Sequence, residues 1–272
     1  MRRLGQADAD EVVRGLGTDP VANCMVLARV EAHGVTPNRL GAELWTVDHP
    51  GRSLCYSGAN LIPVHGSPEA VAMFAELARR QPRACSSLVG MAHLVLPMWE
   101  LLEDWWGPAR EVRARQPLLA LPGAPLVTPD PHVRRVCPSD LPAYLPASVA
   151  MFIEEMGIDP TAADGGAAYR RRVVEHIAEG RAYARFEDGA VVYKAEVGAS
   201  SSTTGQIQGV WVAPERRGSG LAGAGTAAVA AAIRSSHRLP SLYVNDFNAT
   251  ARRVYERIGF HEVATFATVL LH

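Results

Sequence analysis

The spacing of apolar positions predicts alternating strands and helices in the second half of the chain. Short apolar runs with a period of two are typical of strands, and apolar positions three or four apart are typical of helices. Asp188-Gly189 between two such runs indicates a hairpin turn. The predicted strands are 133–136, 182–186, 190–197, 206–212, 242–244 and 262–271, and the predicted helices are 139–152, 167–179, 220–234 and 248–258.

The first half repeats much of this order. Its predicted strands are 43–47, 52–56, 60–64, 86–89 and 111–121, and its predicted helices are 67–80 and 92–105. Both halves therefore follow the series hairpin, strand, helix, strand, helix, strand. This repetition predicts two copies of one α/β fold.

A proline-rich segment separates the two copies. Four prolines between 122 and 131 are incompatible with a helix or a central strand, so this segment is predicted to be an extended linker. The chain then divides into 1–121 and 132–272, and both pieces have ordinary sizes for a domain.

Composition excludes several classes of protein. The chain has 272 residues, 48% of them hydrophobic, and a net charge of -1, whereas nucleic-acid binding depends on excess positive charge. The longest nearly apolar run, 221–233, is too short to span a bilayer, and acidic residues follow the N-terminus where a signal peptide is apolar. We therefore expect a cytoplasmic protein that contacts neither nucleic acid nor membrane.

The cysteines and histidines lack the spacing of metal ligands. The four cysteines contain no CxxC pair, and the nine histidines contain no HxH or HxxxH pair. We expect no metal, and we expect the cysteines to be small buried apolar residues. They are Cys24, Cys55, Cys85 and Cys137.

The segment from Gly209 to Gly223 carries the most chemical information. A predicted strand leads through a glycine-rich turn into an alanine-rich helix, which presents free backbone N–H groups at the positive end of the helix dipole. Phosphate is the natural ligand there, and Gly218 and Gly220 allow a close approach. The alternative is a tight strand-to-helix turn that binds nothing. The glycine spacing fits neither a Walker P-loop nor a dinucleotide fingerprint.

This segment resembles the acyl-CoA-binding motif of the GCN5-related N-acetyltransferases, the GNAT superfamily. The resemblance continues through Leu242 to Phe260, where a strand is followed by Asn248, a short helix with Tyr255, and Gly259-Phe260. It is specific from residue 205 to the end, and it extends less specifically back to residue 133.

The resemblance implies the fold and the cofactor site. It implies two GNAT-like domains, each a mixed, mostly antiparallel twisted sheet flanked by helices, with 132–272 as the acetyltransferase domain. It also implies that a strand bonds the pantetheine arm of acetyl-CoA, that the turn amides hold the pyrophosphate, and that an asparagine lies near the thioester. These cofactor-binding residues are Val210, Trp211 and Val212 for the arm, Arg217, Gly218, Ser219, Gly220, Leu221 and Ala222 for the pyrophosphate, and Asn248.

The resemblance also implies a mechanism in which an amine attacks the thioester directly. Tyr255 would donate a proton to the departing thiolate. Tyr255 also falls on an apolar helix stripe, so the alternative is a core tyrosine with its hydroxyl at the rim.

The general base is the least defined part of the predicted site. Family members often place a glutamate in the strand before the turn, but here that strand carries Gln206 and Gln208. Glu196 on the neighbouring strand is the nearest substitute, and it shares a face with Lys194. The alternatives are a solvated Lys194–Glu196 pair and proton removal through water.

Two further glutamates are candidates for binding the acceptor. Glu154 and Glu155 follow the first predicted helix of the second half and are placed to grip a cationic amine. The alternative is a solvated helix end.

The first half lacks the phosphate turn. The corresponding segment, 64–69, has a single glycine, and Pro68 removes a donor where amides would be needed. We expect 1–121 to be a degenerate copy that does not bind CoA and that walls one side of the substrate cleft. Its tryptophans, Trp99, Trp105 and Trp106, are expected in the core, with the cleft as the alternative.

Together these observations predict an N-acetyltransferase that moves an acetyl group from acetyl-CoA to an amine of a small molecule or a protein. A longer acyl group is an alternative donor. The competing hypothesis is an acyl-CoA sensor that regulates a partner without turnover, and a scaffold that binds nothing is a third. A homodimer is one assembly open to such a protein.

Overall fold

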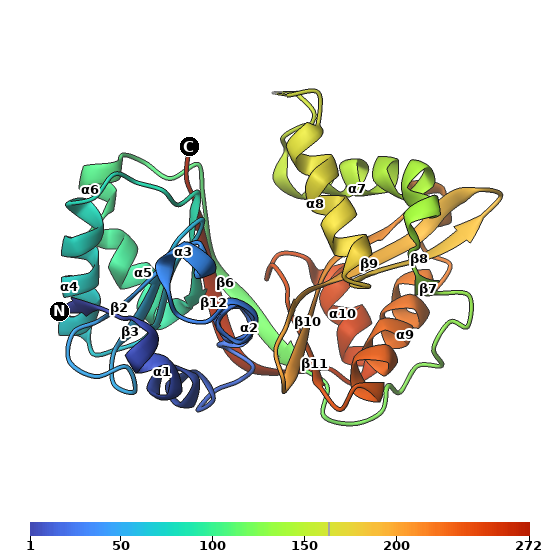
Figure 1. Ribbon diagram of the computed structural model, residues 1–272. Coiled ribbons are helices and arrows are strands. Elements are labelled where there is room, and N and C mark those ends of the chain that lie inside the picture. The colour runs from blue at the N-terminus through green and yellow to red at the C-terminus, as the bar shows by residue number, and fades with distance from the viewer. Residues whose placement is uncertain (163) are drawn as a thin grey trace.

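One sheet of 12 strands runs through both halves of the chain (Figure 1). It is seen in a computed structural model, which describes residues 1–162 and 164–272. The strand order is β1-β2-β3-β4-β5-β12-β6-β11-β10-β9-β8-β7. Most neighbouring strands are antiparallel, and the parallel pairs are β4 with β5 and β10 with β11.

The first half contributes six strands and six α-helices. Its strands are β1 (Arg2–Arg3), β2 (Glu43–Thr46), β3 (Leu54–Ser57), β4 (Leu61–His65), β5 (Ser87–Met91) and β6 (Glu111–Ala120). Its helices are η1 (Gln6–Asp8), α1 (Ala9–Leu16), α2 (Cys24–His33), α3 (Pro37–Leu40), α4 (Pro68–Arg79), α5 (Ala92–Glu100) and α6 (Glu103–Trp106), where η marks a 3-10 turn.

The second half follows the same order after the linker. Its strands are β7 (Arg134–Arg135), β8 (Ala182–Glu187), β9 (Ala190–Ser200), β10 (Thr204–Val212), β11 (Leu239–Tyr243) and β12 (His261–Leu270). Its helices are η2 (Pro138–Asp140), α7 (Leu141–Met156), α8 (Ala167–Ala178), η3 (Pro214–Arg216), α9 (Leu221–Ser235) and α10 (Ala249–Ile258).

The two halves exchange their last strands at the centre of the sheet. β6 ends the first half but lies between β11 and β12 of the second half, and Tyr243 pairs with Leu118. β12 ends the second half but also pairs antiparallel with β5, where Val269 opposes Leu88. Figure 1 shows β6 and β12 side by side where the halves meet. Each half therefore completes its sheet with a strand from the other.

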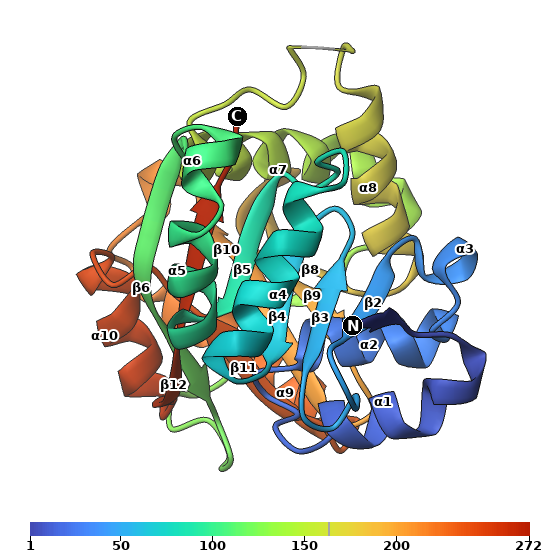
Figure 2. The same cartoon turned by 90° about the vertical axis from the view of Figure 1, so that its left-hand side faces the viewer.

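Helices cover both faces of each half. In the first half α4 and α5 pack on one face, as Figure 2 shows, and α1 and α2 pack on the other. In the second half α9 and α10 share a core with residues such as Tyr193 and Ile207, while α7 and α8 share a core with Ala184 on the opposite face. The apolar side chains of the central strands are thus buried against helices on both faces of the sheet.

The predicted order of elements is confirmed in both halves. One helix differs, because the stretch predicted over 92–105 forms two helices, α5 and α6, that are separated at Leu101 and Leu102. The helices α1, α2 and α3 lie in the first 42 residues, for which no elements were predicted.

The buried and exposed positions correct two expectations. Cys24 and Cys55 are buried as expected, but Cys85 is half-buried and Cys137 is exposed, so the cysteines do not behave as one class. Trp99 is a core residue as expected, whereas Trp105 is 64% exposed. Its ring lies under the guanidinium of Arg79, at 4.0 Å from the ring centre, which explains how an exposed tryptophan is held.

Across the described residues no helix combines the length and the apolar character that a bilayer span requires.

Candidate active site

The strands β10 and β11 diverge toward their carboxyl ends. They pair in parallel only from Thr204 to Gln206 against Leu239 to Ser241. Beyond this point β10 stays paired with β9, and β11 stays paired with β6. Among the described residues, positions 207–212 of β10 therefore have no strand partner on the side of β11, so the backbone groups on this edge that are not bonded to β9 or to a side chain are available to an extended ligand.

A β-bulge interrupts β10 inside this opening. The ladder with β9 passes from the pair Gln208–Glu196 directly to the pair Trp211–Lys194, so Gly209 and Val210 together oppose a single residue. Gly209 has a φ of 59°, a left-handed conformation that glycine adopts readily. A glycine inside a predicted strand was the sequence signal for this bulge, and the sequence analysis missed it.

The turn between β10 and α9 presents a row of free amides. Gly218 and Gly220 have φ values of 77° and 86°, and a Cβ built on either would meet no atom within 4 Å. Within the described chain, the N–H groups of residues 218–222 have no hydrogen-bond acceptor. Residues 218–220 are exposed, Leu221 is buried and Ala222 is half-buried, and all lie at the N-terminal end of α9, where a helix dipole favours negative charge. The turn therefore has the geometry of an anion site.

Charged side chains brace this turn from outside. Arg216 pairs with Glu187, and Arg217 donates to Glu154 Oε2 over 2.7 Å and to the carbonyl oxygen of Val212 over 3.1 Å. Trp211 Nε1 donates to the other oxygen of Glu154 over 3.2 Å. Glu154 is thus already bonded through both of its oxygens, so it is not free in this arrangement to grip an amine.

Asn248 begins α10 at the carboxyl end of β11. Its side chain accepts a hydrogen bond from the backbone N–H of Ala251 over 3.1 Å, as an N-cap does. This cap leaves the Asn248 side-chain amide exposed beside the opening between β10 and β11.

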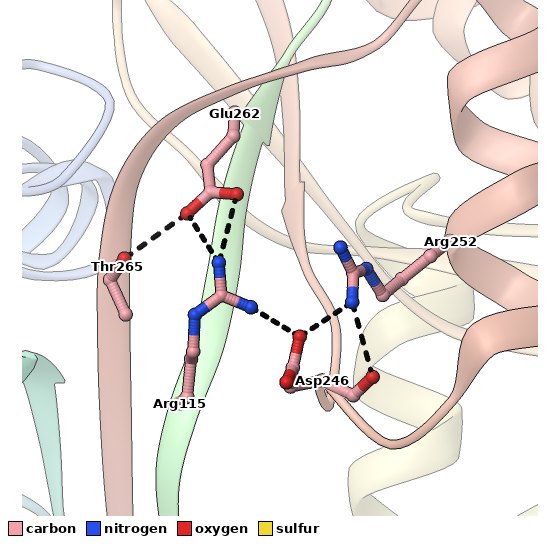
Figure 3. A network of polar contacts seen from close by, with 5 residues as sticks. All are labelled: Arg115, Asp246, Arg252, Glu262 and Thr265. Carbon is pink, nitrogen blue, oxygen red and sulfur yellow. Dashed lines mark hydrogen bonds and ion pairs between the residues drawn. The ribbon is translucent and has the colours of Figure 1, made fainter.

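A polar network that starts on β6 stabilises the segment just before Asn248. Arg115 of β6 pairs with Asp246, two residues before the cap, and contacts Glu262 of β12 at 3.4 Å (Figure 3). Asp246 also accepts from Arg252 over 2.6 Å. Exposed pairs contribute little individually, but a network fixes geometry better than an isolated pair.

A second link from β6 is buried. Gln116 is 3% exposed, donates to Asn245 Oδ1 over 2.7 Å and accepts from Thr268 over 2.6 Å. The first half therefore holds the end of β11 in place directly, at the point where this strand meets the opening.

Tyr255 points into the core shared by α9 and α10. It is 8% exposed, and its ring packs edge-on against Phe260 with centres 6.1 Å apart. Among the described residues no partner is bonded to its hydroxyl. Burial raises the pKa of Tyr255, and the Glu155 carboxylate raises it further, so the hydroxyl is protonated at neutral pH.

Lys194 and Glu196 form a buried ion pair on the face covered by α7. Lys194 is 0% exposed, Glu196 is 6% exposed, and Nζ to Oε1 is 2.8 Å. The alternative of a solvated Lys194–Glu196 pair is therefore wrong. Tyr144 of α7 also donates to Glu196 over 3.2 Å. Burial tends to raise the pKa of Glu196, but Lys194 overrides it and holds that pKa well below its ordinary value.

Glu155 differs from its neighbour Glu154. Both were predicted to come after the end of this helix, but they lie within the last turn of α7. Among the described residues, no cationic side chain pairs with the Glu155 carboxylate. Arg113 of β6 donates to the backbone carbonyl oxygen of Glu155 over 3.1 Å. Burial is the main cause that raises the pKa of both Tyr243 and Tyr255, and the Glu155 carboxylate adds to it in each case.

The first half keeps a similar divergence without the amide turn. β4 and β5 pair in parallel only at Leu61 and Leu88. In the turn that follows, the Ser67 hydroxyl accepts from the N–H of Ala70 over 3.3 Å, and Pro68 has no N–H. Fewer free donors face outward here than at the start of α9.

Comparisons with known proteins agree with this geometry. The FR47-like protein family matches residues 194–269, and a domain family of unknown function, DUF4081, matches residues 42–144. Comparison with curated proteins gives no significant match.

Solved structures match the whole length of the chain. An acetyltransferase of the GNAT family from Colwellia psychrerythraea has a TM-score of 0.58 at 10% identity and covers 100% of this chain and 99% of its own. The chain has the GNAT fold. A tandem GNAT protein from the clavulanic acid biosynthesis pathway has a TM-score of 0.55 at 16% identity, covering 98% of this chain and 97% of its own. A Drosophila protein has a TM-score of 0.68 at 15% identity, covering 99% and 98%.

The resemblance to the GNAT superfamily and the fold class are thereby confirmed. The residues predicted to bind acetyl-CoA lie along this opening, on β10, on the turn and at the start of α10. Lys194 was recognised only as a neighbour of Glu196, although a single lysine among 27 basic residues was a signal for a special environment.

Proposed function

We propose that the protein is an N-acetyltransferase that transfers an acetyl group from acetyl-CoA to an amine. The observation that carries this proposal is the opening between β10 and β11 beside the free amides of residues 218–222. A strand edge suits an extended pantetheine arm, and adjacent amides at a helix N-terminus suit a pyrophosphate. The second half, 132–272, would carry catalysis, and 1–121 would not bind CoA.

The residues fit the parts of acetyl-CoA in order along the opening. Val210, Trp211 and Val212 would bond the pantetheine arm through the unpaired edge of β10. The free amides of Gly218, Ser219, Gly220, Leu221 and Ala222 would hold the pyrophosphate, whereas the N–H of Arg217 already donates to the carbonyl oxygen of Pro214 over 3.3 Å. Asn248 would lie near the thioester end, where its exposed amide is free to donate.

The chemistry asks the protein mainly to position two reactants. An amine attacks the thioester carbonyl carbon, the carbon–sulfur bond breaks, and the thiolate takes a proton. Holding both reactants in place supplies much of the acceleration. Tyr255 is the proposed proton donor because the resemblance assigns this role to the tyrosine of α10 and because, among the described residues, no partner is bonded to its hydroxyl; its raised pKa makes it a weaker acid than a free tyrosine. Glu155 is the proposed contact for the cationic form of the acceptor, since its carboxylate has no other described cation.

The acceptor amine must lose a proton, and Glu196 is the carboxylate that the sequence suggests for this step. Its low pKa makes it a weak proton acceptor toward an ammonium group. We therefore favour proton removal through water, with Glu196 held as a carboxylate by Lys194.

Replacing Tyr255 by Phe should separate chemistry from binding. We expect kcat to fall by about 100-fold, the lower range for losing a general acid, while the Kd for acetyl-CoA stays unchanged. Thiol release measures the first quantity and calorimetry the second. Tyr193→Phe is the matched control, because it also removes a buried tyrosine hydroxyl. That hydroxyl is hydrogen-bonded to Thr226 over 3.2 Å. Normal turnover by Tyr255→Phe would remove Tyr255 from the mechanism.

Replacing Glu196 by Gln should test the base. The groups that face this carboxylate are Lys194 on β9, Tyr144 on α7, and His176 and Arg172 on α8. We expect the pH–rate profile to keep its shape, because water removes the proton. A selective loss of rate at low pH, where the amine is protonated, would instead identify Glu196 as the base.

Stability of the same variant provides an internal control. A lowered folded-state pKa means that Glu196 stabilises the protein above its unfolded pKa, about 4.3, and that this stability is lost as pH falls further. Glu196→Gln should therefore be about 3–5 kcal/mol less stable than wild type at pH 7, with a smaller difference near pH 3. Chemical denaturation at both pH values measures this difference.

A screen of amines separates this proposal from its alternative, a sensor that binds acyl-CoA without turnover. The low basicity of Glu196 is the observation that favours a sensor. Release of free thiol with any amine in the panel supports the transferase. Tight binding of acetyl-CoA without product across the panel supports the sensor, and absence of binding contradicts both.

A further inference from the structure

Lys194 has no evident structural reason to be buried. Its ammonium donates to Glu196 over 2.8 Å and to the carbonyl oxygen of Gly209 over 3.4 Å, and it lies 5.4 Å from the centre of the Tyr144 ring. Buried ion pairs add little stability, because apolar residues of similar volume serve as well or better. A role other than stability would explain why this pair is present.

The Lys194–Glu196 ion pair lies opposite the two ends of the β-bulge of β10. Glu196 and Lys194 are the two residues of β9 that pair on either side of the bulge, with Gln208 and Trp211. A Cβ on Gly209 would lie 3.2 Å from Met151 Cε and 3.4 Å from Lys194 Nζ. The bulge therefore rests on the ion pair and on α7.

The peptide group between Gly209 and Val210 connects the pair to the opening. The carbonyl oxygen of one residue and the N–H of the next belong to one planar unit and point in opposite directions. Lys194 binds the carbonyl oxygen of Gly209, which directs the N–H of Val210 away from the pair. This N–H lies in the part of β10 that lacks a partner on the side of β11.

We propose that Lys194, held by Glu196, is a positioning residue that orients the Val210 amide to donate to the carbonyl oxygen of the thioester. The inference rests on the proposed binding of acetyl-CoA in this opening. The same hydrogen bond would favour the oxygen as it gains negative charge during attack. The pair would thereby distinguish acetyl-CoA from CoA, which has no carbonyl at this position.

The test compares the two ligands in calorimetry, so it needs no knowledge of the acceptor. We expect wild type to bind acetyl-CoA about two- to tenfold more tightly than CoA, which corresponds to one neutral hydrogen bond. The double variant Lys194→Met, Glu196→Leu removes both charges and conserves volume, so it avoids an unpaired buried charge. It should bind CoA as wild type does and lose the preference for acetyl-CoA.

Two further variants keep the outcome interpretable. Gly209→Ala disturbs the bulge directly and should also remove the preference. Thr226→Val removes the buried hydrogen bond to Tyr193 on the opposite face and should retain it. A double variant that retains the preference while Gly209→Ala loses it would overturn the role of Lys194. A wild type that binds neither ligand would instead contradict the proposed function.

Discussion

A chain that starts at residue 122 should fail to form the acyl-CoA site. Such a chain keeps every predicted site residue, yet it lacks β6, the common neighbour of β11 and β12. It also lacks Gln116 and Arg115, which hold Asn245 and Asp246. Because few molecules would adopt the competent fold, we expect acetyl-CoA affinity to fall by at least about 100-fold, and cooperative unfolding to be lost. Calorimetry and thermal denaturation measure both effects.

A cut in the linker is the matched control for this truncation. A specific protease site inserted after Gly123 lies in an exposed segment with open space around it. After cleavage the two pieces should elute together, bind acetyl-CoA and separate only in denaturant, because each supplies a strand to the other. Separation under native conditions, or full binding by the truncated chain, would contradict the exchange of strands.

Replacing Gly220 by Glu should abolish binding of acetyl-CoA. Gly220 caps α9 with a φ of 86°, where any side chain is strained by about 1–2 kcal/mol. The glutamate also places a negative charge among the amides proposed for the pyrophosphate. We expect the Kd to rise by at least about 100-fold, equivalent to roughly 2.7 kcal/mol, from repulsion and a displaced turn together.

Two controls separate the causes of this loss. Gly220→Ala adds the strain without the charge and should weaken binding much less. Gly41→Glu adds both the backbone strain and the negative charge, but in the first half of the chain. Gly41 has a φ of 67°, and there is open space around it. This substitution should lower the melting temperature without changing the affinity. Equal affinities for wild type and Gly220→Glu would place the pyrophosphate elsewhere.

Local patterns in the sequence account for most elements and for the turn. Asp188-Gly189 predicts the β8–β9 hairpin, and Asn248 and Gly259 mark the two ends of α10. Gly218 and Gly220 predict a backbone that only glycine adopts easily, and both have positive φ. These features depend on a few neighbouring residues, so they can be derived from one sequence.

The features that escaped prediction depend on distant partners. The sequence of β6 does not predict its pairing with β11, because an interior strand has the same apolar pattern whichever strand lies beside it. The Lys194–Glu196 pair resembles an exposed pair in sequence, since charged residues are rarely buried. The helix α2 has Asn23 at its N-cap, a residue type typical of helix starts, and the sequence analysis missed this signal; the Asn23 side chain makes no capping bond and donates to the carbonyl oxygen of Leu16.

The exchange of β6 and β12 also determines when the protein can fold during its synthesis. β5 occupies residues 87–91, but its partner β12 occupies residues 261–270 and is made much later. Strand β5 is therefore flanked on both sides only after residues 261–270 have been made. Contacts between such distant segments form slowly and leave apolar strand edges exposed in the meantime. A nascent chain would thus keep one edge of β5 without its strand partner until residues 261–270 have been made.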